Sequence, residues 1–203
     1  MTKIETRGAL EALYGEAVIN ALKKETPELT PEYLRWIERS CFFAIASVGA
    51  TGLDCSPRGD APDQLFKILD NKRLAIPDRR GNNRLDTLKN IVIDPRVSLL
   101  FFIPGIEETL RIKGKATLTT DPALIDAFDV DGKKPLTVIL VDIDTVFFQC
   151  ARALKRAHFW DIGAQADKSS VPTAGQMARG AISGFDGDAY DSDLADRQKA
   201  TLY

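Results

Sequence analysis

Runs of apolar residues alternate with short polar turns through the middle of the chain, and this pattern predicts a β-rich centre. The first run is apolar on consecutive positions, which is typical of a strand buried on both faces. No regular helical crossovers separate the runs, so a doubly wound parallel sheet is disfavoured. Mostly antiparallel strands of this number would leave open edges unless they close into a barrel. The expected strands are 41–48, 53–57, 66–69, 73–76, 97–103, 109–119, 136–141 and, after a break, 145–149.

Helical periodicity flanks these strands. Apolar residues at three-and-four spacing predict one helix over 10–22, and Thr30-Pro31 predicts a second that ends near residue 39. Further helices are expected at 85–93 (apolar face Leu88, Ile91 and Val92), at 122–128 and at 151–160. The tail after Trp160 is expected to be less structured, because residues 186–196 carry five aspartates and read as a solvated surface segment.

The fold class predicted from these elements is mainly β with flanking helices (α+β), arranged as a closed or partly open β-barrel. We expect one domain over 1–203, the usual count for this length. Within it, a helical N-terminal segment spans about 1–40, the barrel about 41–150 and a C-terminal extension about 151–203.

Composition narrows the function classes. Lys plus Arg is 27 and Asp plus Glu is 29, a net charge of -2 that argues against a dedicated nucleic-acid binder. One histidine and three scattered cysteines without a C-x-x-C pair predict no metal site and favour a reducing compartment, the cytoplasm. The charged N-terminus is no secretory signal, and the longest apolar run, 41–48, is too short to span a membrane.

The densest basic stretch is 67–96, with eight Lys or Arg against four Asp. Its centre, 77–84, lies between a strand and a helix, where free backbone N–H groups suit a phosphate. Arg79 and Arg84 supply planar donor forks that match phosphate oxygens. The alternative is a solvated turn whose arginines pair with Asp78 and Asp86.

Two other stretches are candidates for ligand contact. Ser56-Pro57-Arg58-Gly59-Asp60 could let a flat ring lie against the backbone, or it could be an ordinary strand-ending turn. Thr109, Arg111 and Lys113 share one face of a strand, which could line a site or simply face water. No nucleophilic triad, phosphate-binding P-loop or dinucleotide fingerprint is present, so a bound cofactor is the more economical carrier of any chemistry.

Together these stretches resemble the pyridoxamine-phosphate-oxidase-like FMN-binding split-barrel family, in particular a bacterial subgroup of FMN-dependent proteins. The similarity covers roughly residues 30–180, and the block 77–84 is its most specific part. The residues that carry it are Ser56–Asp60, Ile76–Arg84, Thr87–Ile91, Asp94–Val97, Thr109–Gly114, Arg152–Ala157 with Trp160-Asp161, and Pro172–Gln176.

The resemblance implies a six-stranded antiparallel split barrel and a homodimer with two FMN sites at the subunit interface. By position, Ser56, Pro57 and Arg58 would lie along the isoalloxazine ring, and Pro77 and Asp78 near the ring and the ribityl chain. Asn83 and Arg84, with Arg79, would hold the phosphate. Thr109 and Arg111 would approach the flavin from the partner subunit, and Trp160 would cover the site.

The function implied is that of an FMN-dependent oxidoreductase acting by hydride transfer at flavin N5, with its substrate and catalytic residues unassigned. The alternative is a non-catalytic protein on the same fold that binds or carries flavin, haem or deazaflavin. The chain departs from the true oxidases at Ser56–Asp60, where they have a longer basic strand. It also lacks a clear match to their C-terminal arginine and histidine pattern, so pyridoxamine phosphate is not implied as the substrate.

Overall fold

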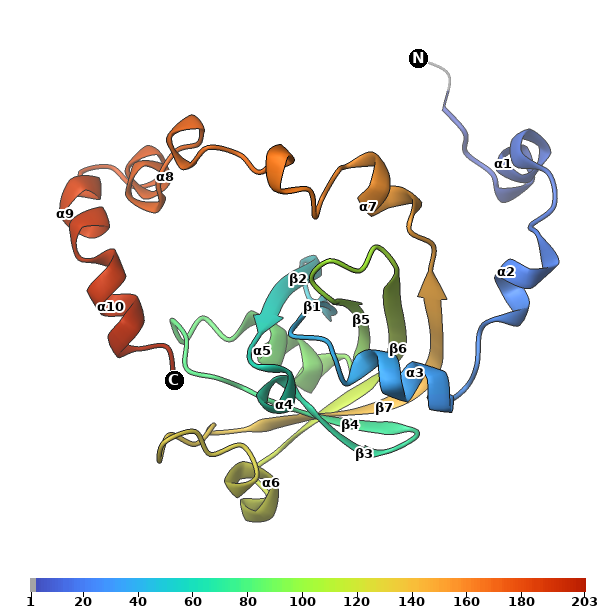
Figure 1. The fold of residues 1–203 in the computed structure, drawn as a ribbon, viewed down its shortest axis with the longest axis horizontal. Coiled ribbons are helices and arrows are strands. Elements are labelled where there is room, and N and C mark those ends of the chain that lie inside the picture. The colour runs from blue at the N-terminus through green and yellow to red at the C-terminus, as the bar shows by residue number, and fades with distance from the viewer. Residues whose placement is uncertain (1–2) are drawn as a thin grey trace.

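The protein, described from residue 3 to residue 203 by a computed structural model, is built on a seven-stranded antiparallel sheet (Figure 1). Its order is β2-β1-β5-β6-β7-β4-β3. The strands are β1 (Phe42–Gly49), β2 (Gly52–Gly59), β3 (Lys67–Asp70), β4 (Arg73–Pro77), β5 (Arg96–Phe102), β6 (Thr109–Thr119) and β7 (Val138–Gln149). The mainly antiparallel, β-rich architecture with flanking helices is as expected.

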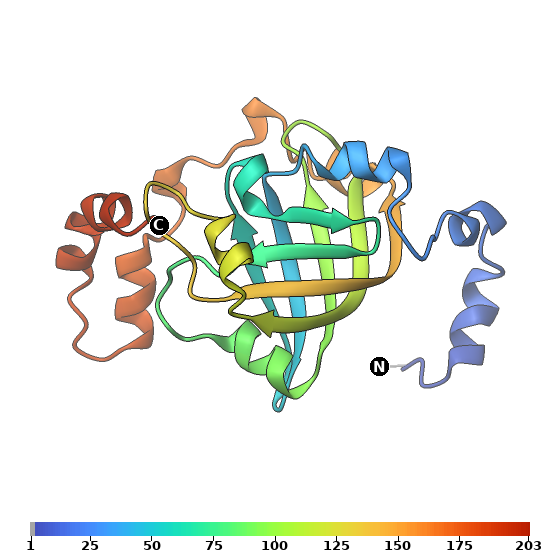
Figure 2. The same cartoon turned by 90° about the horizontal axis from the view of Figure 1, so that it is seen from below.

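The sheet folds over itself, so that β3, β4 and part of β7 run across β1, β2 and β5 (Figure 2). The core lies between these layers. Phe101 is its centre: its ring lies 4.8 Å from that of Phe43 and 5.4 Å from that of Phe66. Burial of such large apolar side chains is the main force holding the layers together.

The strand count differs from the six strands that the resemblance implies. The hairpin 67–77 contributes two strands, and the four-residue β3 pairs only with β4. Within residues 3–203, no hydrogen-bonded pairing joins β2 to β3, so the sheet keeps two edges and closure of the barrel is not shown.

β1 is not buried on both faces, contrary to the expectation for 41–48. Phe43, Ile45 and Ser47 are buried, whereas Ala44 and Ala46 between them are half-exposed. Alternation of this kind marks a sheet with one covered face. The consecutive apolar residues therefore serve two different surfaces, an inner core and an outer apolar face.

The short helices that pack against the barrel follow the sequence signals closely. Thr30 caps α3 (Pro31–Ile37), because its Oγ1 accepts a hydrogen bond of 3.2 Å from Tyr33 N. In α5 (Asp86–Ile93), Leu88 and Ile91 are buried as expected, but Val92 is 75% exposed and was wrongly assigned to the apolar face. The other two flanking helices are α4 (Pro62–Leu65) and α6 (Pro122–Asp126). β7 runs without interruption through the predicted break, where its pairing with β6 shifts register between Ile143 and Thr145.

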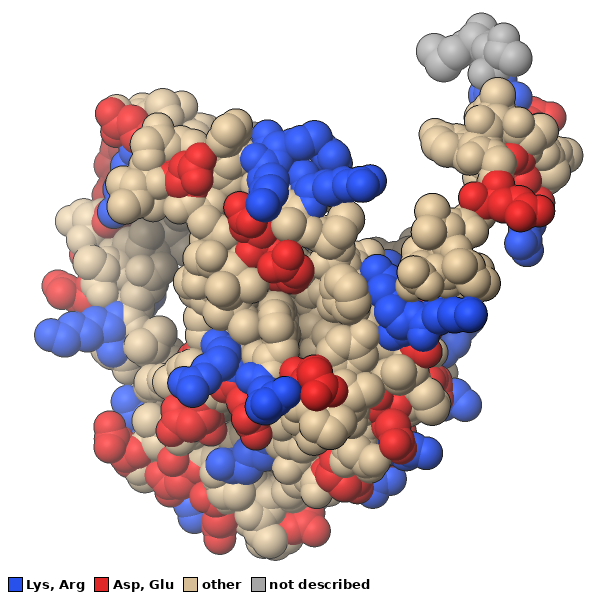
Figure 3. Space-filling view, turned by 45° about the vertical axis from the view of Figure 1, so that its right-hand side comes forward, with Lys and Arg blue, Asp and Glu red and all other residues tan. Residues whose placement is uncertain are grey.

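The N-terminal arm, residues 3–25, departs from the expected single helix over 10–22. It forms α1 (Arg7–Tyr14) and α2 (Ile19–Lys23), which are separated at Gly15 with φ +71°. Neither helix has a buried residue. Figure 3 shows the arm projecting from the body on a narrow neck. Its apolar stripe therefore has no core to cover within the described chain.

The C-terminal strap, residues 151–203, is also more structured than predicted. It carries α7 (Arg152–Arg156), two 3₁₀ turns (Ile162–Ala164 and Lys168–Ser170), α8 (Ala174–Ala181), α9 (Gly187–Ser192) and α10 (Leu194–Ala200). It passes over one end of the barrel and returns toward α4 and α5 (Figure 1). The aspartate-rich stretch is helical because Asp186 caps α9 through a 3.0 Å bond from Ala189 N.

No helix in residues 3–203 combines the length and the apolar character that crossing a membrane requires.

Candidate functional site

Two adjoining cavities lie where the end of β2, the end of β4 and the start of α5 meet. The larger has a volume of about 860 Å³ and the smaller about 400 Å³. Both are bordered by Arg58, Asp78 and the loop that follows β4. Volumes of this size suit a cofactor or a drug-sized ligand. Of the residues predicted for a ligand site, those found here are Ser56, Pro57, Arg58, Pro77, Asp78, Arg79, Asn83 and Arg84.

The loop between β4 and α5 has a strained backbone. Leu85 has a φ of 60°, in the left-handed region that residues other than glycine and asparagine rarely adopt, and the nearby Asn83 has a φ of 59°, which asparagine tolerates. The side chain of Asn82 holds the turn by accepting a 3.1 Å hydrogen bond from Arg84 N. Backbone strain of this kind gathers at ligand-binding sites, where surrounding contacts hold the chain ready.

The strained loop leads directly into α5. Leu85 occupies the N-cap position and provides no side-chain cap to the first turn of the helix. The helix therefore presents its N-terminal backbone N–H groups, with their partial positive charge, beside the larger cavity. An anionic group is the favoured ligand for such a terminus.

Asp54 fastens the β2 side of the site to α5. Its Oδ2 accepts hydrogen bonds from Ser56 Oγ at 3.1 Å and from Thr87 Oγ1 at 3.5 Å. Thr87 is buried. The contact fixes Ser56 and the neighbouring strand end relative to the helix N-terminus, so the larger cavity has a rigid wall.

Two buried side-chain atoms lack a hydrogen-bond partner in residues 3–203, and both belong to residues that border the larger cavity. They are Nε of Arg58 and Oγ1 of Thr137. Buried polar atoms are almost always paired, since an unpaired one costs about 1–3 kcal/mol. Both are polar groups without a partner in the described residues, and both lie at the border of the same cavity.

Asp78 lies beside Arg58 at the border of both cavities. Arg58 Nη2 lies 3.8 Å from Asp78 Oδ1, and the two side chains are largely buried. Burial raises the pKa of the Asp78 carboxyl above its ordinary value, and the Arg58 charge opposes that shift. Asp78 N donates to Thr137 O at 3.0 Å, so the backbone beneath it is fixed to the 133–137 loop.

The larger cavity has a basic lining. Its border holds six basic residues and only two acidic ones, Asp78 and Asp86. The basic residues are Arg58, Arg79, Arg80, Arg84, Lys133 and Lys134. This excess favours an anionic ligand. Lys133 and Lys134 come from the loop before β7, and nothing in the sequence pattern signalled their approach.

Arg79 was predicted as a phosphate contact, but its guanidinium is already engaged. Nε donates to Asp60 Oδ2 at 3.0 Å, Nη1 to Phe128 O at 2.7 Å and Nη2 to Gln64 Oε1 at 3.3 Å. These bonds tie the loop to α4 and to the chain after α6. Among the described residues, the Arg84 side chain pairs with Asp86 alone and is 77% exposed, so its guanidinium is the freer of the two.

Three predicted residues lie elsewhere in this chain. Thr109 and Arg111 are on β6, and Trp160 donates from Nε1 to Ile106 O at 2.8 Å on the neighbouring loop. None of the three borders either cavity. Arg111 on β6 lies opposite Leu100 on β5, and Leu100 lies opposite Ala44 on β1. Ala44 in turn lies opposite Pro57 on β2, at the site. Arg111 is therefore three strand spacings, or roughly 14 Å, from the site.

Two residues of the strap, Leu202 and Tyr203, border the cavities and had no sequence signal at all. Tyr203 is 143 positions from its hydrogen-bond partner Asp60. Residues 3–203 bring together no group of three His, Cys, Asp or Glu side chains suited to a metal ion.

Comparisons with known proteins agree with this architecture. Residues 29–150 match the family model described as pyridoxamine 5'-phosphate oxidase. The crystal structure of a HupZ variant from Group A Streptococcus is 17% identical, covers 60% of this chain and 99% of that chain, and superposes with a TM-score of 0.50. A proposed pyridoxamine 5'-phosphate oxidase from Lactobacillus delbrueckii is 20% identical over 60% of this chain and 95% of its own, with a TM-score of 0.48. No curated protein matches the chain.

Proposed function

The chain belongs to the pyridoxamine 5'-phosphate oxidase family, and on that premise we propose that it binds FMN in the larger cavity and acts as an FMN-dependent oxidoreductase. The observation that carries the proposal is that two buried polar atoms at the border of a basic cavity, Arg58 Nε and Thr137 Oγ1, have no hydrogen-bond partner in residues 3–203. A ligand with an anionic end and several polar atoms would satisfy them.

The residues fit the chemistry of FMN. Asn83 and Arg84 would hold the phosphate together with the N-terminus of α5, where both charge and free N–H groups are favourable. Ser56, Pro57 and Arg58 would border the ring system. Pro77 and Asp78 would lie near the ring and the ribityl chain, where the Asp78 carboxyl, which borders both cavities, would be a partner for a ribityl hydroxyl.

FMN, when bound, supplies hydride transfer at its N5 atom. The chain's own part is to bind, orient and shield: the Asp54 contacts fix the wall, and Arg79 fixes the loop. No side chain is assigned as acid or base. The substrate class is left open by these residues.

A homodimer completes the proposal. Thr109, Arg111 and Trp160 lie away from the cavities of their own chain, and in a dimer they would reach the partner's flavin. The outer face of the sheet supports this, because Ala44, Ala46 and Leu100 are half-exposed there. An uncovered apolar sheet face is a common site of subunit contact.

The proposal is tested by the absorption spectrum of the purified protein before and after incubation with FMN and removal of unbound ligand. Retention of a flavin spectrum at about one FMN per chain is the expected result. A protein that stays colourless at high FMN concentration would contradict the proposal. Reduction of bound FMN by nicotinamide donors or a substrate panel then separates an oxidoreductase from a flavin carrier.

A further inference from the structure

The strap ends inside the proposed flavin site. The family match stops at residue 150, and the strap crosses some fifty further positions before its last residues return to the cavities. Leu202 borders the smaller cavity, and Tyr203 borders both. Because the six residues common to the two cavities include Tyr203, it forms part of the wall they share.

Two side chains, those of Asp60 and Arg79, fix the orientation of Tyr203. Its hydroxyl donates to Asp60 Oδ1 at 2.7 Å, while the other carboxylate oxygen of Asp60 accepts from Arg79 Nε at 3.0 Å. The Asp60 side chain is only 4% exposed, so water competes little for these bonds. The Arg79 guanidinium lies 5.2 Å from the centre of the Tyr203 ring, within range of a cation–π contact.

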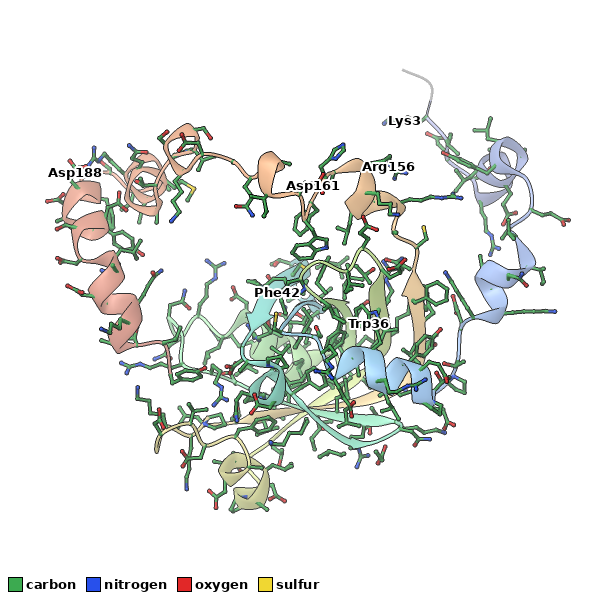
Figure 4. All side chains as sticks on the ribbon, viewed as in Figure 1. Lys3, Trp36, Phe42, Arg156, Asp161 and Asp188 are labelled. Atoms are coloured by element: carbon green, nitrogen blue, oxygen red, sulfur yellow. The ribbon has the colours of Figure 1, made fainter. Side chains whose placement is uncertain are left out.

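Hydrogen bonds and close helix packing within the strap hold it together, so Tyr203 belongs to an ordered segment. Asp191 on α9 accepts bonds from Gly175 N at 2.7 Å and from Thr173 Oγ1. α8 and α9 pack so closely that a Cβ on Gly175 would meet Gly187 O at 2.1 Å. Figure 4 shows two points along the strap, with Asp161 above the barrel and Asp188 on α9 far to its side.

From these contacts we propose that Tyr203 is a ligand-positioning residue of the FMN site, held by Asp60 and Arg79 so that it closes the larger cavity toward the smaller one. The inference rests on the proposed function. The proposal implies that removal of the Tyr203 ring joins the two cavities and weakens the binding of an aromatic ligand that lies against their shared wall.

The test compares the full-length protein with Tyr203→Ala and Tyr203→Phe. The control is Tyr14→Ala, because Tyr14 is 81% exposed on the N-terminal arm and contacts neither cavity. The first readout is hydrogen–deuterium exchange of the flavin-free proteins. In Tyr203→Ala, amides of residues 76–81 and 194–203 are expected to exchange about tenfold faster, since both segments lose their shared contact. The control should leave both segments unchanged.

The second readout is FMN titration. Tyr203→Ala should raise the Kd at least about tenfold, whereas Tyr203→Phe keeps the ring and should stay within about threefold of the wild type. An unchanged Kd in Tyr203→Ala, or unchanged exchange at 76–81, would overturn the inference while leaving FMN binding intact. Failure of the wild-type protein to bind FMN would instead overturn the proposed function, and this inference with it.

Discussion

Arg84 is the residue on which the phosphate assignment most depends. It borders the larger cavity, and its one ion pair, with Asp86, is exposed and weakly stabilising. Arg84→Ala should therefore raise the Kd for FMN about tenfold or more, because a charge-assisted bond to phosphate is lost. Isothermal titration measures this directly. Arg7→Ala is the matched control, since Arg7 also pairs with a neighbouring carboxylate and is exposed. Equal Kd values for the two variants would remove Arg84 from the site.

Asp94 provides a pH-dependent contact between α5 and β5. Its carboxylate accepts bonds from the side chain and backbone N–H of Arg96, which lower the pKa of Asp94 from 3.8 to about 2. The ionised form is favoured by folding, so this stability is present above pH 3.8 and is lost as pH falls toward 2.

Asp94→Asn should be less stable than the wild type at pH 6, and the difference should shrink between pH 4 and pH 2. Urea unfolding at several pH values measures it. A difference that stays constant down to pH 2 would show that the Arg96 contact does not depend on the charge of Asp94.

At the scale of elements, the sequence predicts best where one local signal decides the structure. β6 was predicted with its observed bounds, Thr109–Thr119, because its alternation is long and its ends are marked by turns. The expected helix over 10–22 was wrong because periodicity continues across Gly15 although the backbone does not. The strap was misjudged because its caps, such as Asp186 and Thr173, are polar residues that also suit a loop.

Gly114 shows an element-level constraint that composition does not reveal. It lies at the irregular step between β6 and β7, where a Cβ would meet Asp142 O at 2.1 Å. Gly114→Ala should lower the free energy of unfolding by about 1–3 kcal/mol, because backbone and sheet must shift to admit the methyl group. Chemical denaturation measures the loss. Gly8→Ala in α1 meets nothing within 4 Å and should show no loss. A stable Gly114→Ala variant would mean that the two strands can separate locally at little cost.

At the scale of the whole molecule, the apolar outer face of the sheet leads to a prediction about assembly. Ala44→Glu puts a charge on that face, and the proposed homodimer should dissociate because a charge would be buried at the interface. Sedimentation velocity should show a shift from dimer to monomer. Val92→Glu, on the exposed side of α5, serves as the control and should leave the dimer intact. A monomeric wild-type protein would contradict the dimer itself.

The candidate site shows which parts of a binding site a single sequence can reveal. The contiguous block 77–84, which borders the cavities, could be singled out from the sequence because its glycine, arginines and flanking elements lie together in the chain. Thr137, Lys133 and Tyr203 were missed because only the folded sheet and strap bring them there. The engagement of Arg79 by Asp60, Gln64 and Phe128 was likewise invisible, since its partners are spread over 70 positions. Charge and glycine content indicate which kind of ligand a loop can bind, but tertiary contacts decide which of its side chains are free to bind it.

The seating of Tyr203 against Asp60 has a practical consequence for handling this protein. A bulky label attached beside Tyr203 would press on the wall that the two cavities share. α1 and α2 have no buried side chain, so a label on an exposed residue there, such as Tyr14, would leave that wall undisturbed. Binding assays on protein labelled beside Tyr203 would report on a site already altered by its label.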